Sequence, residues 1–120
     1  MLKRAFLLAL ALLIAVNPIA QGHSALVSSN PKSDAMLMKS PKSISLTFNE
    51  DLIKISGKNI SKISLSNTFG TVKLGVITVN KRIITAKLLK TLPASKYKVT
   101  YRVVSADGHP ISGSFNFWVH

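Results

Sequence analysis

Apolar and polar residues alternate through much of the chain after residue 42, and this period of two predicts β-strands with one buried face. The segment 43–48 places Ile44, Leu46 and Phe48 on the same side. In the two longest alternating segments we expect Tyr101 and Phe115 to lie in the core. The other predicted strands, taken in chain order, are 62–67, 72–79, 82–88, 96–104 and 111–119.

Turn residues divide these segments at intervals of about ten residues. The breaks fall at Asn30-Pro31, Ser40-Pro41, Ser56-Gly57, Phe69-Gly70, Leu92-Pro93 and Asp107-Gly108. About seven short strands at this spacing predict an all-β fold, a seven-stranded antiparallel sandwich or small barrel. The segment 32–39 is the one place where a short helix would fit the sequence.

The first 22 residues have the pattern of a secretory signal peptide, with a short cationic head before an uncharged apolar run at 5–16. A membrane-spanning helix needs about 20 apolar residues, and this run has only 12. Small residues at Ala20 and Gly22 favour cleavage before His23, and cleavage after Ala20 is the alternative. We therefore expect a cleaved signal, 1–22, and a mature domain, 23–120, that is exported to the periplasm.

The mature chain is strongly basic and contains no cysteine. All four acidic residues and fourteen of the sixteen Lys and Arg lie in residues 23–120. These cations are spread along the chain without interleaved aromatic residues, a pattern that argues against nucleic-acid binding. Without cysteine there is no disulfide and no thiolate ligand, so the core alone must stabilise the fold. We expect a monomer with a solvated basic surface.

No catalytic motif is evident, but the segment SADGHPISG at 105–113 is distinctive. Asp107, Gly108 and Pro110 suit a tight turn between the two longest predicted strands. His109 follows Asp107 by two residues, so both side chains point the same way on extended backbone. The sequence has no phosphate loop, no serine nucleophile elbow and little material for a pair of hydrolytic carboxylates. The segment is either a plain turn or part of a metal site.

Cleavage before His23 would convert that residue into a chelating metal ligand. Its free amine and its imidazole Nδ1 would close a six-membered ring around one ion, while His109 and Asp107 would add a nitrogen and an oxygen. Three nitrogens and one oxygen without sulfur suit tetragonal Cu(II) better than tetrahedral zinc. The amine must lose a proton to bind, and its ordinary pKa is about 7.7 to 8.0, so copper binding should weaken in acid. The residues favour one Cu(II) ion.

Three segments also carry a resemblance to a known family: HSALVSSNP at 23–31, PKSISLTFNEDL at 41–52 and LPASKYKVTYRVVSADGHPISGSFNFWV at 92–119. They resemble the periplasmic copper-resistance protein CopC family, which includes CopC-, PcoC- and YobA-like copper-binding domains. The resemblance implies an immunoglobulin-like Greek-key fold and a periplasmic copper-binding protein that is not an enzyme. It maps the Cu(II) ligands onto His23, Asp107 and His109. It also places Glu50 near the site, where it would orient a ligand or a bound water.

The sequence departs from family members that carry a methionine-rich loop with its own histidine as a separate Cu(I) site. The corresponding stretch, SNTFGTVKLG, has no methionine, and the mature chain contains only Met36 and Met38. Two thioethers could contact Cu(I), but we favour apolar packing for both, and we interpret His120 as a frayed terminal side chain and not as a ligand. Trp118, on the strand face opposite to Phe117, is either outer packing or a reporter near the metal. We predict a protein specific for Cu(II).

The predicted role is to sequester Cu(II) and deliver it to a membrane partner, which the resemblance suggests is a CopD-like inner-membrane protein. Two other classes remain open. One is a copper-dependent oxidative enzyme with an N-terminal histidine brace, similar to lytic polysaccharide monooxygenases, although the 98-residue mature chain shows no flat aromatic surface for a polysaccharide. The other is a metal-free, envelope-binding β-sandwich that uses its basic surface.

Overall fold

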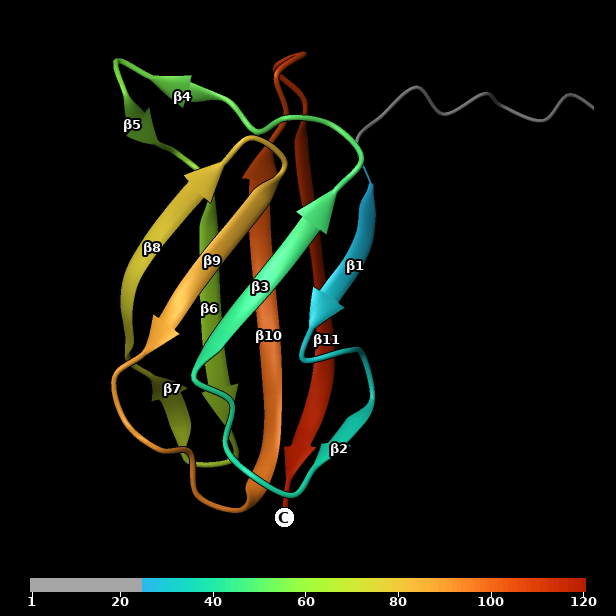
Figure 1. Cartoon of the computed structure of the whole chain (residues 1–120), viewed down its shortest axis with the longest axis vertical. Coiled ribbons are helices and arrows are strands. Elements are labelled where there is room, and N and C mark those ends of the chain that lie inside the picture. Colours follow the sequence, from blue (N-terminus) through green and yellow to red (C-terminus); the bar gives the residue numbers. More distant parts are fainter. Residues whose placement is uncertain (1–24) are drawn as a thin grey trace, which may run out of the picture.

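The computed structural model describes residues 25–120, so His23 and the predicted signal segment lie outside the described residues. The described chain folds into two β-sheets that pack face to face, with a small two-stranded hairpin at one end (Figure 1). One sheet has the strand order β1-β3-β9-β8, the other has the order β2-β11-β10-β6-β7, and the hairpin is β4-β5. In this part of the chain no helix has the length and hydrophobicity to cross a membrane.

Seven of the strands have five or more residues, and every pairing among these seven is antiparallel. This arrangement confirms the predicted all-β sandwich. The seven are β1 (Leu26–Asn30), β3 (Ser43–Phe48), β6 (Lys62–Asn67), β8 (Leu74–Asn80), β9 (Ile83–Leu88), β10 (Ser95–Val104) and β11 (Pro110–Val119). The short strands are β2 (Ala35–Leu37), β4 (Lys54–Ile55), β5 (Lys58–Asn59) and β7 (Gly70–Val72).

Strand β2 (Ala35–Leu37) lies within the segment 32–39, where the sequence allowed a short helix that the structure does not form. It pairs in parallel with the end of β11, from Ala35 against Phe117 to Leu37 against Val119. This ladder gives partners to backbone groups of β11 that would otherwise form an open sheet edge. The pairing partner of β2 lies far away in the sequence, so the local sequence does not reveal the stabilisation that pairing provides.

The two methionines do not pack into the protein as the sequence suggested. Met36 is 69% exposed and Met38 is 80% exposed, whereas Leu37 between them packs against the core. Because side chains alternate between the faces of a strand, the burial of Leu37 turns both methionines outward. The expectation that they fill space as apolar packing is therefore wrong.

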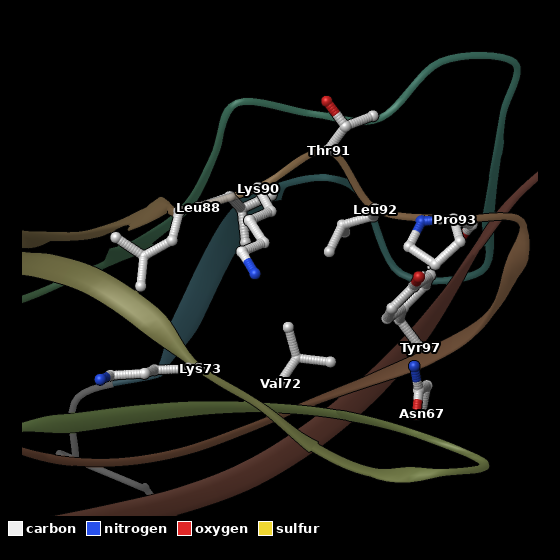
Figure 2. Close-up of a pocket in the computed structure, with 10 residues that line it drawn as sticks. Asn67, Val72, Lys73, Leu88, Lys90, Thr91, Leu92, Pro93 and Tyr97 are labelled. Atoms are coloured by element: carbon white, nitrogen blue, oxygen red, sulfur yellow. Dashed lines mark hydrogen bonds between the residues drawn. The ribbon is translucent and has the colours of Figure 1, made fainter.

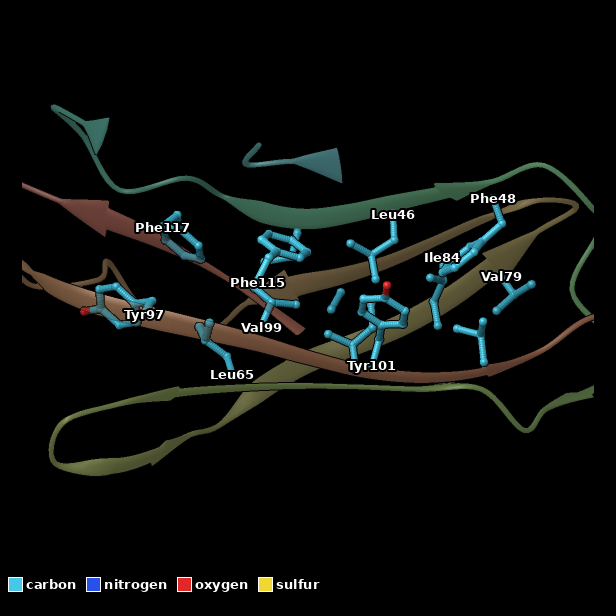
Figure 3. Close-up of a cluster of buried hydrophobic side chains, with 14 of the residues drawn as sticks. Leu46, Phe48, Leu65, Val79, Ile84, Tyr97, Val99, Tyr101, Phe115 and Phe117 are labelled. Carbon is cyan, nitrogen blue, oxygen red and sulfur yellow. The ribbon is translucent and has the colours of Figure 1, made fainter. Parts of the chain in front are cut away.

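The core lies between the two sheets and is filled by the inward-facing residues of both (Figure 3). Phe48 and Tyr101 meet edge to face with ring centres 5.7 Å apart, while Tyr97 stacks on Phe117 at 5.3 Å. Such aromatic pairs contribute about 0.5–1.5 kcal/mol beyond the burial of their area. Tyr101 and Phe115 are only 9% and 8% exposed, which confirms their predicted place in the core.

Strands β10 and β11 form a long hairpin that fixes what lies at each end of the sandwich. The register pairs Ser95 with Val119 at one end and Val104 with Pro110 at the other. At about 3.3–3.4 Å per residue, strands of this length span about 30 Å. The connection 105–109 lies at the end where β1 begins and β3 ends (Figure 1). Trp118 belongs to the other end, so it is not a reporter close to His109.

Candidate functional site

The turn that carries the predicted ligands is built on Ser105, which is fully buried. The backbone N–H of Ser105 donates to the carbonyl of His109 at 3.1 Å, and its carbonyl accepts from the N–H of Gly108 at 2.8 Å. Gly108 has a φ of +89°, a conformation that glycine adopts at little cost. The chain therefore reverses within 105–109 and leaves Asp107 and His109 on the outside.

Asp107 and His109 lie side by side on this turn. The Nδ1 atom of His109 is 3.2 Å from Oδ2 of Asp107. The other carboxylate oxygen, Oδ1, accepts hydrogen bonds from the Ser105 hydroxyl and, at 3.0 Å, from the backbone N–H of His109. The side chains of His109 and Asp107 are 59% and 35% exposed, so an ion can reach both from solvent.

Hydrogen bonds to the ionised carboxylate lower the pKa of Asp107 to about 2. The Ser105 hydroxyl contributes most to this shift, and the backbone N–H of His109 contributes next. A metal ion must usually displace a proton from its ligand. Asp107 is already ionised at neutral and mildly acidic pH, so its oxygen is available to an ion without that competition.

Segments that are far apart in the sequence meet at this end of the sandwich. The N–H of Ala25 donates to Oδ1 of Asn49 at 2.6 Å, and the carbonyl of Ala25 accepts from the N–H of Asn49 at 3.1 Å. Two residues further on, the carbonyl of Asp51 accepts from the N–H of Ala106 at 2.9 Å. The loop after β3 therefore connects the first described residue to the turn at 105–109.

The structure brings together two of the predicted ligands, Asp107 and His109. Glu50 is half buried in the same loop after β3, between the two residues that bind Ala25 and the turn. His23 lies outside the described residues, so its role stays a prediction. Within residues 25–120 no three His, Cys, Asp or Glu side chains are grouped so that they could hold a metal ion. Asp107 and His109 are thus a two-residue pair that needs another ligand.

Sequence reasoning missed two residues that organise this end, Ser105 and Asn49. Ser105 continues the inward-facing series that includes Tyr101 and Val103. A hydroxyl at such an inward-facing position, two residues before the Asp of an Asp-Gly turn, was a usable signal for a buried donor. Asn49 offered no local signal, because its partner Ala25 lies 24 residues earlier in the chain.

A hollow of about 310 Å³ lies at the opposite end, between β7 and the loop that follows β9 (Figure 2). Val72, Leu88 and Leu92 give it a largely apolar lining, and the hydroxyl of Tyr97 beside it donates to the carbonyl of Pro93 at 2.6 Å. Burial raises the pKa of this tyrosine. The residues that line the hollow include no His, Asp or Glu, so it has no part in the predicted copper site.

The fold and the turn define a small β-sandwich protein that presents a carboxylate and an imidazole together at one end. Comparison with known proteins identifies the family within this class. Residues 26–120 match the family model of the CopC domain. The chain therefore belongs to the CopC family.

Relatives and solved structures agree with this assignment. Copper resistance protein C of Escherichia coli is 32% identical over 109 residues, which cover 83% of each chain. Copper transport protein CutJ of Bacillus subtilis is 30% identical over 121 residues, a match that covers 96% of this chain but only 21% of the length of CutJ. The crystal structure of PcoC, a methionine-rich copper resistance protein from Escherichia coli, superimposes with a TM-score of 0.69 at 29% identity, over 82% of this chain and 100% of PcoC.

Membership of this family confirms the predicted class of function, a copper-binding protein of copper resistance. The CopC family consists of copper carriers and not of enzymes. The two alternative classes, an oxidative enzyme and a metal-free envelope protein, are therefore set aside.

Proposed function

We propose that the mature chain binds one Cu(II) ion between His109, Asp107 and an N-terminal His23, holds it in the periplasm, and passes it to a membrane partner. The observation that carries this proposal is the separation of 3.2 Å between Nδ1 of His109 and Oδ2 of Asp107. Two donors that each lie about 2 Å from one ion, at a right angle, are about 3 Å apart. The pair therefore suits two neighbouring positions of a tetragonal copper site.

The position of Ala25 supports His23 as the remaining ligand. Two residues of chain extend over at most about 7 Å, so chain length alone would keep a ligand at position 23 close to Ala25. Ala25 is held by Asn49, in the loop that also binds the turn. A free amine and an imidazole from His23 would complete a set of three nitrogens and one oxygen.

This donor set suits capture and transfer of the oxidised ion. Nitrogen and oxygen donors without sulfur favour Cu(II) over Cu(I), so the bound ion is protected from reduction. Glu50, half buried in the adjoining loop, is proposed to orient a ligand or a bound water. The exposure of the pair allows a partner to replace the ligands one at a time, and we propose a CopD-like inner-membrane protein as that partner.

The deciding experiment combines mass spectrometry of the N-terminus of the exported protein with Cu(II) electron paramagnetic resonance. We expect a chain that begins at His23 and a spectrum of one Cu(II) with three nitrogen donors. Loss of a direct ligand should exceed the roughly 10- to 100-fold effect of losing an outer partner. Acetylation of the His23 amine removes that donor without supplying another amine, so it should weaken binding by at least about 100-fold.

An acetylated chain that binds Cu(II) as tightly as the chain with a free amine at His23 would contradict the proposal. A control is a glycine added after His120, at the other end of the molecule, which should leave Cu(II) affinity unchanged. A mature protein that begins at Gln21 or at any residue other than His23 would also contradict the proposed ligand set.

A further inference from the structure

Strand β2 and the end of β11 place a second group of metal-binding side chains next to one another. In this parallel pair Met36 lies opposite Trp118. The ladder continues by one more hydrogen bond, because the N–H of His120 donates to the carbonyl of Leu37 at 2.8 Å. The backbone of His120 is therefore held at Leu37, next to Met38 in the chain, while the side chain of His120 is exposed.

The alternation of burial turns these four side chains toward the same outer face. On β11, Phe117 and Val119 are 0% and 5% exposed and point into the core, so Trp118 between them faces outward. The next outward position is His120, which is exposed. On β2 the inward neighbour is Leu37, which packs against the core, and both Met36 before it and Met38, the first residue after β2, are well exposed.

The spacing of the strands brings these side chains within reach of one ion. Adjacent strands lie about 4.8 Å apart, and alternate residues of a strand lie about 6.7 Å apart. Met36 and Trp118 are thus neighbours across the ladder, and Met38 and His120 are the residues that directly follow the two strands, so the four side chains define a patch of about 5 by 7 Å at strand spacing. Methionine is unbranched and flexible, so both sulfurs and the imidazole can converge above the patch while the backbone stays as it is.

The chemistry of this patch selects a soft ion. Thioether sulfur is a ligand that favours Cu(I), and imidazole also binds copper. An indole face attracts cations that lie within about 6 Å of its centre. The Trp118 ring already has this property here, since the ammonium group of Lys96 lies 5.3 Å from its centre. Lys96 comes from β10, on the opposite side of β11 from β2.

We propose that Met36, Met38 and His120 form a Cu(I) site on the outer face of β2 and β11, with Trp118 against the bound ion. About nine residues of extended strand, or about 30 Å, separate this patch from His109. The site is therefore independent of the proposed Cu(II) site, and it replaces the prediction that the protein is specific for Cu(II).

Trp118 is the single tryptophan of the chain, so its fluorescence reports on this patch directly. We would titrate the mature protein with Ag(I), a soft monovalent ion without redox chemistry, and then with Cu(I) under anaerobic conditions against a chromophoric chelator. Both ions should quench Trp118 and saturate at one ion per chain. The double variant M36L/M38L nearly conserves side-chain volume and should weaken binding by at least about 100-fold, more than the loss of an outer partner does.

Two control variants keep the two copper sites apart. H109A should bind Ag(I) and Cu(I) as wild type does, and M36L/M38L should retain the Cu(II) resonance spectrum and the thermal unfolding midpoint of wild type. H120A, which removes one donor, should weaken Cu(I) binding less than M36L/M38L does. The proposal is overturned if neither ion quenches Trp118 in the wild type, or if M36L/M38L binds Cu(I) with unchanged affinity.

Discussion

Ser105 holds the proposed copper ligand Asp107 in position, and its replacement by alanine tests the geometry of the site. The Ser105 hydroxyl donates to Oδ1 of Asp107, and it makes the largest contribution to the lowered pKa of that carboxyl group. In the S105A variant only the backbone N–H of His109, at 3.0 Å, still donates to Oδ1. The carboxylate can then rotate, and Oδ2 is no longer fixed toward the imidazole.

The expected magnitudes follow from these contacts. The pKa of Asp107 should rise from about 2 toward its ordinary value of 3.8. Removing a hydrogen-bond partner of a metal ligand weakens metal binding about 10- to 100-fold. Because Asp107 is partly exposed and keeps one donor, we expect the lower end of this range, about a tenfold loss of Cu(II) affinity.

The pH dependence of stability has a definite sign. The pKa of Asp107 in the folded state lies below its unfolded value, so the group stabilises the fold above the unfolded value of 3.8. This contribution is lost as the pH falls toward the folded-state pKa of about 2. The difference in the free energy of unfolding between wild type and S105A should therefore be largest above about pH 4 and should shrink toward about pH 2.

Carboxyl NMR titration of the metal-free protein measures the pKa of Asp107, and competition with a chromophoric chelator measures Cu(II) affinity. Ser61 provides the matched control, since it is 4% exposed and its hydroxyl accepts from the N–H of Val104 at 3.1 Å. S61A deprives a backbone N–H of this partner, which costs about 1–3 kcal/mol. It should lower the free energy of unfolding and leave both the pKa of Asp107 and the Cu(II) affinity unchanged.

An S105A protein in which the pKa of Asp107 stays near 2 and Cu(II) affinity is unchanged would refute this reasoning. A loss of Cu(II) affinity as large in S61A as in S105A would show that the affinity follows the stability of the fold and not the orientation of Asp107.

Two further predictions concern the other ligand and the hairpin behind it. H109A should lose at least about 100-fold in Cu(II) affinity but keep its unfolding midpoint, because the side chain is 59% exposed. D107N keeps an oxygen donor, so it should lose less Cu(II) affinity. Chelator competition that shows an unchanged Cu(II) affinity in H109A would disprove the ligand assignment. G113A should destabilise the fold by about 1–3 kcal/mol, because a Cβ at Gly113 would overlap the ring of Tyr101; a wild-type midpoint in urea unfolding would show that Tyr101 can move without cost.

The sequence predicted strands well wherever one face of the strand is buried along its whole length. The predicted segments 43–48 and 62–67 agree with β3 (Ser43–Phe48) and β6 (Lys62–Asn67). In both, burial alternates with the side chains, as the pattern required. The predicted strand 72–79 is instead divided at Lys73, because β7 pairs with β6 in one sheet and β8 pairs with β9 in the other. The local pattern of apolar and polar residues does not show where the chain passes from one sheet to the other.

Strand β2 and its methionines show the limit of local reasoning more clearly. Three residues are too few to show a period, and their partners lie at the far end of the chain, in β11. The pairing decides which of Met36, Leu37 and Met38 faces the core. The exposure of the methionines, and with it the proposed Cu(I) site, is a result of tertiary structure.

The proposed Cu(II) site was partly accessible from sequence because its two described members belong to one turn. Asp107 and His109 are two residues apart, and the buried Ser105 that orients the carboxylate lies two residues before Asp107. The approach of Ala25, the first described residue, to the loop that binds this turn was not accessible in the same way. It depends on the hydrogen bonds of Ala25 to Asn49 and of Ala106 to Asp51, which follow from the packing of the two sheets.

The division of the proposed Cu(II) site between two sheets explains why no part of it is complete alone. The turn at 105–109 belongs to the sheet of β10 and β11, whereas the segment that leads back to His23 joins β1 in the other sheet. Residues 25–120 accordingly supply only a pair of donors, with no group of three. Cu(II) affinity should therefore require both a folded sandwich, which brings the two sheets into contact, and an N-terminus freed by cleavage, which supplies the amine. If the proposal holds, an unprocessed or unfolded chain should bind Cu(II) more weakly than the folded chain that begins at His23.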